Sequence, residues 1–129
     1  MNAQIAIPKE LGGSELHGSP RDNHTFHAYT NPNWPAEWFA MNKKGQRVRS
    51  TSSSGPSQIC LTSPDVREAV CKQLRAFIKR DRENASSPEL YPHIYDISHN
   101  DGNGECYCPT CTAVLEREGA YSGVLLDLK

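Results

Sequence analysis

Three cysteines crowd into the segment His99–Cys111, which reads HNDGNGECYCPTC and follows a run of Ile and Tyr residues. Cys106, Cys108 and Cys111 form a C-x-C-x-x-C pattern, which can place three thiolates around one zinc ion, and His99 could complete a tetrahedral Cys₃His set. In an oxidising compartment a disulfide between two of the three, or to Cys60, is the competing interpretation. The spacing therefore leaves zinc, a disulfide and free thiols open.

Composition excludes several classes of partner. The 129 residues carry 14 basic and 15 acidic side chains, a formal charge of −1, which supplies no field for attracting nucleic acid. No segment approaches the ~20 apolar residues of a membrane span, and the N-terminal sequence MNAQIAIPKELGG lacks the features of a signal peptide. We expect no nucleic acid or membrane partner, and this chain by itself leaves its localisation open.

The clearest predicted element is an amphipathic helix that begins after Ser63. Ser63 is a plausible N-cap, Pro64 suits the first turn, and Asp65 favours the positive end of the helix dipole. Apolar residues then recur at spacings of three and four, and the helix should end between residues 80 and 84. The apolar positions are Val66, Ala69, Val70, Leu74, Phe77 and Ile78.

Strands are expected on both sides of this helix, over residues 58–61 and 91–98, and helical character resumes over 112–117. The order strand, helix, strand, loop, helix is typical of a βαβ unit in an α/β fold. Residues 1–23 read as a loop-rich N-terminal segment, and 24–29 as the end of another strand. Pro35 could open a short aromatic helix. The apolar pattern from residue 121 stops without a cap, so the chain looks truncated.

Polar and aromatic residues supply further candidates. Asn100 and Asp101 directly follow the second predicted strand, where function collects in parallel α/β folds, although Asp before Gly is also a common turn. Trp34 and Trp38 belong to an aromatic group with Tyr29 and Phe39 that could stack against sugars or simply be core. His24 and His27 would share one face of a strand.

Five blocks of this sequence resemble, in order, a bacterial glycoside-hydrolase-like family, domain of unknown function 4838. They are HTF at 24–26, PAEWFAMNKKGQRV at 35–48, QICLTSPDVREAV at 58–70, ISHNDGNGECYCPTC at 97–111 and GAYSGVLL at 119–126. The family resembles (β/α)₈ TIM barrels of the hexosaminidase and α-glucuronidase type. Because a complete barrel takes about 250 residues, the resemblance implies that residues 24–129 are a segment of about three β/α units.

The resemblance also implies roles for individual residues. Asp101 would be the general acid of a glycoside hydrolase, Asn100 would orient an acetamido group, and His24, Trp34 and Trp38 would contact the carbohydrate. The remainder of the parent barrel would be a required partner, so this chain alone is expected to be inactive, and export of the parent would favour disulfides in the cysteine loop. No cofactor is expected, with zinc as the alternative. Two other hypotheses stay open: a non-catalytic carbohydrate-binding module and a small Cys₃His zinc-stabilised interaction domain.

Overall fold

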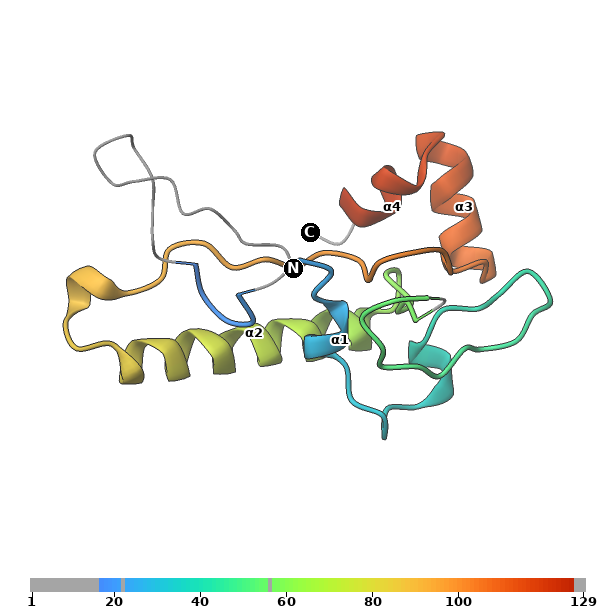
Figure 1. Cartoon of the computed structure of the whole chain (residues 1–129). Helices are drawn as coiled ribbons and strands as arrows, with labels where there is room; N and C mark the ends of the chain where they lie inside the picture. The colour runs from blue at the N-terminus through green and yellow to red at the C-terminus, as the bar shows by residue number, and fades with distance from the viewer. Residues whose placement is uncertain (1–16, 22, 56, 127–129) are drawn as a thin grey trace.

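The computed structural model describes residues 17–21, 23–55 and 57–126, and these form helices joined by long loops (Figure 1). One long helix, α2, runs along the molecule, and α3 and α4 pack against each other near one of its ends. The elements in chain order are α1 (Phe26–Tyr29), the 3₁₀ helix η2 (Ala36–Trp38), α2 (Pro64–Asn84), the 3₁₀ helix η3 (Pro88–Leu90), α3 (Pro109–Glu118) and α4 (Tyr121–Leu126).

Helix α2 confirms the prediction made from its N-cap and its periodicity. The Ser63 side chain accepts a hydrogen bond from the Val66 amide at 3.4 Å, and Pro64 occupies the first helical position, where no amide donor is needed. The helix ends at Asn84, inside the predicted range. None of the described helices is long and apolar enough to cross a membrane.

The main core lies where α1 and the segment before α2 meet the apolar face of α2. Tyr29 of α1 packs edge-to-face on Phe77 of α2, with ring centroids 5.3 Å apart. Such aromatic pairs add to the stabilisation from area burial alone. The cluster comprises Phe26, Tyr29, Ile59, Leu61, Val66, Val70, Phe77, Val114 and Val124.

The C-terminal helices follow local signals. Pro109 opens α3, which is longer than the predicted 112–117, and Gly119 ends it in the left-handed conformation at φ 73°. A glycine after the last helical turn adopts this conformation without the Cβ penalty. The Gly119 amide closes the turn by donating to the Leu115 carbonyl at 2.8 Å. Helix α4 then carries the apolar pattern seen from residue 121 onward.

The expected α/β fold is wrong: the described residues contain four isolated β-bridges and no sheet, so there is no TIM-barrel segment. The two predicted strands do not form, and their backbones bond to different neighbours and not to each other. Residues 58–60 pair with 38–40, because the Ala40 amide donates to Gln58 and the Cys60 amide to Trp38. Residues 94–98 instead meet the N-terminal part, through Gly18 to Ile94 and Phe26 to Ser98.

The strand expected over 24–29 is also wrong, since Phe26–Tyr29 is the short helix α1. His24 adopts a positive φ of 59° two positions before it, so His24 and His27 do not lie on one pleated face. The short aromatic helix after Pro35 is confirmed as η2. Most of the loop-rich segment predicted over 1–23 lies outside the described residues, as do residues 127–129.

Candidate metal centre and aromatic groove

Four buried cysteines converge at one point, with their Sγ atoms all within 4.8 Å of one another. The Cys60 sulfur lies 3.7 Å from that of Cys108 and 3.9 Å from that of Cys111. Tetrahedral zinc with Zn–S bonds of about 2.3 Å would hold its sulfurs about 3.8 Å apart. The observed separations therefore match a tetrathiolate zinc site formed by Cys60, Cys106, Cys108 and Cys111.

Two distant parts of the chain supply these sulfurs. Cys60 belongs to the extended segment before α2, which is held in place by the bond from its own amide to the Trp38 carbonyl at 2.8 Å. Cys106 and Cys108 lie in the loop before α3, and Cys111 lies in the first turn of α3. The Tyr107 amide ties this loop to Met41 at 2.7 Å. Both segments are thus positioned by backbone bonds around the cluster.

Hydrogen-bond donors surround the sulfurs. Cys106 accepts from the Met41 amide at 3.3 Å and from the Arg47 guanidinium at 3.6 Å. Arg47 is itself fixed by a 2.8 Å bond to the Phe39 carbonyl, and the Thr62 hydroxyl lies 3.1 Å from the Cys111 sulfur. Four thiolates on a divalent cation leave a net charge of −2, so nearby donors and a cation suit a metal-bound set.

The thiols also differ in acidity. Hydrogen bonds from Cys106 and then Cys111 hold the pKa of Cys60 far below its usual range. The bond to Cys106, the bond to Cys60 and burial raise the pKa of Cys111. For Cys106 the bond to Cys111 lowers the pKa, but the bond to Cys60 and burial raise it to about 11. The hydrogen bonds of the cluster therefore favour a thiolate at Cys60, and the thiolate is the form in which cysteine binds a metal.

The cluster changes the metal set expected from the sequence. Cys106, Cys108 and Cys111 come together as predicted, but the fourth member is Cys60 and not His99. All five cysteines of the chain are free thiols, with Cys71 exposed on α2. The sequence indicates Cys60 only as a possible disulfide partner. Its place beside the other three cysteines follows from the pairing of residues 58–60 with 38–40.

Asn100 and Asp101 have opposite environments. Asn100 is fully buried: its side-chain oxygen accepts from the His27 amide at 2.8 Å and its side-chain nitrogen donates to the Ser57 carbonyl at 2.6 Å. The Asp101 side chain is exposed, while its amide donates to the Ser53 carbonyl at 2.9 Å. The side-chain amide of Asn100 is thus already hydrogen-bonded within the protein, whereas the Asp101 carboxyl is open to solvent.

His24 and His99 lie beside this pair of residues. Their rings meet edge-on, with centroids 6.0 Å apart, and the His24 Nδ1 contacts the His99 carbonyl at 3.2 Å. Both side chains are half-buried. His99 therefore stands with His24, away from the cysteine set in which the sequence placed it.

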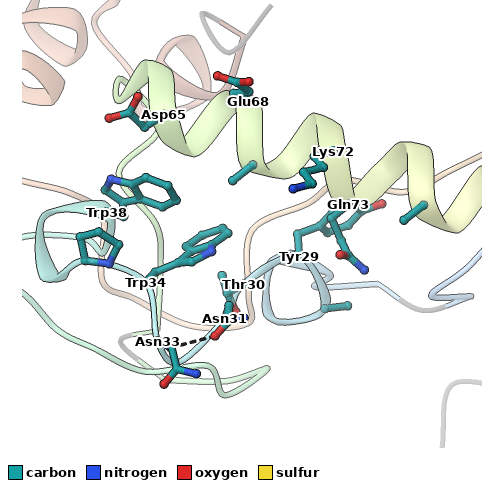
Figure 2. A pocket seen from close by; sticks show the side chains of 14 residues that line it. Tyr29, Thr30, Asn31, Asn33, Trp34, Trp38, Asp65, Glu68, Lys72 and Gln73 are labelled. Atoms are coloured by element: carbon teal, nitrogen blue, oxygen red, sulfur yellow. Dashed lines mark hydrogen bonds between the residues drawn. The ribbon is translucent and has the colours of Figure 1, made fainter.

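A groove of about 610 Å³ opens between α2 and the loop that carries the two tryptophans (Figure 2). Trp34 and Trp38 are half-buried and pack edge-to-face, with centroids 5.1 Å apart. Across from them α2 presents Asp65, Glu68 and Lys72. The groove is amphipathic, with an aromatic floor and polar walls, and neither Asp101 nor His24 lines it.

A family model described as Domain of unknown function (DUF4838) matches residues 12–129. This confirms the family recognised from the five sequence blocks and extends it toward the N-terminus. No curated protein and no solved structure matches the chain. The family's description names no activity, so the expected relationship to glycosidases stays a prediction.

Proposed function

The chain belongs to the family described as domain of unknown function (DUF4838), and because that description assigns no activity, we propose from the geometry that it is a zinc-binding domain. The carrying observation is the convergence of four buried cysteine sulfurs within 4.8 Å. Cys60, Cys106, Cys108 and Cys111 would hold one ion with no position left for water or substrate. Such a closed tetrathiolate site is structural and not catalytic.

The role of this ion would be to join the segment before α2 to the loop before α3, in addition to the backbone bonds that position both segments. The second core cluster is made almost entirely of the cysteines themselves, with Ala40 and the half-buried Met41 beside them. A metal can supply the folding free energy that such a small apolar cluster lacks. The loop before α3 would then depend on the ion for its conformation.

The test is metal analysis of the purified chain, with Cys60→Ser compared with Cys71→Ser. Cys71 is the fifth thiol and lies exposed on α2, so it controls for loss of a thiol elsewhere. We expect one zinc per chain in the wild type and in Cys71→Ser, and loss of zinc in Cys60→Ser. Iron in place of zinc would keep the tetrathiolate but overturn the choice of metal, and disulfides in the purified chain would overturn the site.

A second candidate function is carbohydrate binding in the aromatic groove. Its support is the pairing of Trp34 and Trp38 along a groove whose opposite wall carries hydrogen-bonding side chains (Figure 2). Ligand sites of this kind combine apolar aromatic surface with a few polar groups that fix orientation. Calorimetric titration with oligosaccharides should show binding that Trp34→Ala weakens and that Tyr91→Ala, beyond the groove, leaves unchanged.

Hydrolysis is a separate proposal, with Asp101 as the general acid. Its exposed carboxyl is accessible to a substrate, but it does not line the groove. A sugar bound at Trp34 would therefore have to extend beyond the groove to reach it. Binding without any hydrolysis would support the groove as a carbohydrate-binding module only.

A further inference from the structure

Three histidines share one hydrogen-bonding arrangement. The Nδ1 atom of His24 contacts the His99 carbonyl at 3.2 Å, that of His27 contacts the His24 carbonyl at 2.7 Å, and that of His99 contacts the Asn100 carbonyl at 2.8 Å. A carbonyl oxygen can only accept, so each Nδ1 must carry the hydrogen. In the neutral rings this leaves each Nε2 with a free lone pair.

No described residue bonds any of these Nε2 atoms. An imidazole that donates its Nδ1 hydrogen to a carbonyl and keeps Nε2 open is oriented in the way that metal-bound histidines are. Of the three, His24 and His99 have their rings in contact, with centroids 6.0 Å apart and an angle of 60° between the planes. These two imidazoles form a pair.

The backbone at His24 adopts the left-handed conformation beside this pair. Its φ of 59° is uncommon for a residue with a side chain, and such strain persists only where the surroundings impose it. Here the Ser98 amide donates to the Thr25 hydroxyl at 3.0 Å, and the Phe26 amide donates to the Ser98 carbonyl at 2.9 Å. These bonds clamp residues 24–26 against residues 98–99.

We propose that His24 and His99 form a second metal site, which binds a divalent transition-metal ion such as Ni²⁺ through their Nε2 atoms. Imidazole nitrogen is a preferred ligand for nickel, copper and zinc, whereas thiolates prefer softer metal ions. Two imidazoles in neighbouring positions on one ion would have centroids about 5 Å apart, given metal–nitrogen bonds of about 2 Å. The observed separation of 6.0 Å is within about 1 Å of this value.

A buried polar contact ties this pair to the segment of the cysteine centre. The Asn100 carbonyl that accepts from His99 also accepts from the Gln58 side chain at 2.8 Å, and the Gln58 side-chain oxygen accepts from the Asn100 amide at 3.1 Å. Gln58 lies two positions before Cys60. The Asn100 carbonyl that orients His99 is thus held by a residue of the segment that also carries Cys60. The two sites nevertheless have different ligands.

The test is calorimetric titration of the purified chain with Ni²⁺, with the imidazole NMR signals recorded and released zinc assayed in parallel. The variants are His24→Asn, which tolerates the positive φ, and His99→Gln, and the control is His93→Gln on an exposed position. We expect one Ni²⁺ per chain, selective broadening of the His24 and His99 signals, and at least tenfold weaker binding in either variant. The proposal would be overturned by an equal loss of Ni²⁺ affinity in His93→Gln, by unchanged affinity in both His24→Asn and His99→Gln, or by Ni²⁺ binding that releases an equal amount of zinc. The cysteine centre is tested separately, by the metal content of the untreated chain.

Discussion

The Cys60 and Cys108 sulfurs lie 3.7 Å apart although 48 positions separate them in the chain. Helix α2, with 21 residues, lies within that interval, so this contact closes a large loop that contains the longest described helix. Closing such a loop costs chain entropy, which a metal bond can offset. The stability of the protein should therefore depend on the state of these sulfurs.

Cys60→Ser should destabilise the chain by more than about 3 kcal/mol, the scale expected when a bound metal is lost. Urea unfolding followed by the fluorescence of Trp34 and Trp38 measures the change. A chelator should lower the wild-type midpoint and leave Cys60→Ser unaffected. Cys71→Ser should stay within about 0.5 kcal/mol of wild type, because its side chain is exposed. A chelator-insensitive wild type would contradict the zinc centre.

Asn100→Asp should destabilise the chain by about 3 kcal/mol, although it changes few atoms. The buried Asn100 nitrogen donates to the Ser57 carbonyl at 2.6 Å, and a carboxylate would place an acceptor against that acceptor without solvent to separate them. Asn103→Asp, on an exposed position of the same loop, is the matched control. Equal unfolding midpoints for the two variants would show that the buried contact has little effect.

Stability should fall at alkaline pH through Tyr29. Burial, followed by the nearby Asp96, raises the pKa of Tyr29 from 10.0 to about 12. Because the folded pKa lies above the unfolded one, this contribution is fully present below pH about 10 and is lost as pH rises toward 12. Tyr29→Phe should show a shallower alkaline decline in the free energy of unfolding, despite losing the bond to the Asp96 carbonyl. Parallel declines would exclude Tyr29 as the cause.

Asp101→Asn separates catalysis from binding. If Asp101 protonates a leaving group in the protein that carries this domain, the variant should cleave glycans at least about 100-fold more slowly while still binding them. Its unfolding midpoint should not change, since the side chain is exposed. Turnover equal to wild type would remove Asp101 from the proposed chemistry.

Local signals in the sequence were sufficient for α2. Ser63, Pro64 and the apolar spacing act within a turn or two of the helix, so the element follows from neighbouring residues. The C-x-C-x-x-C spacing was equally informative, because Cys106, Cys108 and Cys111 are neighbours in the chain and needed only one turn of α3 to converge.

Tertiary structure decided what joins these local pieces. Backbone hydrogen bonds do not depend on side-chain identity. The residue types of segments 58–61 and 91–98 therefore do not reveal whether these segments pair with each other or with a third segment. Here they pair with 38–40 and with the N-terminal part, which removes the expected barrel and brings Cys60 to the other cysteines. The sequence determined the helix and the grouping of three cysteines, and only long-range pairing could bring Cys60 to them as the fourth and place His99 beside His24.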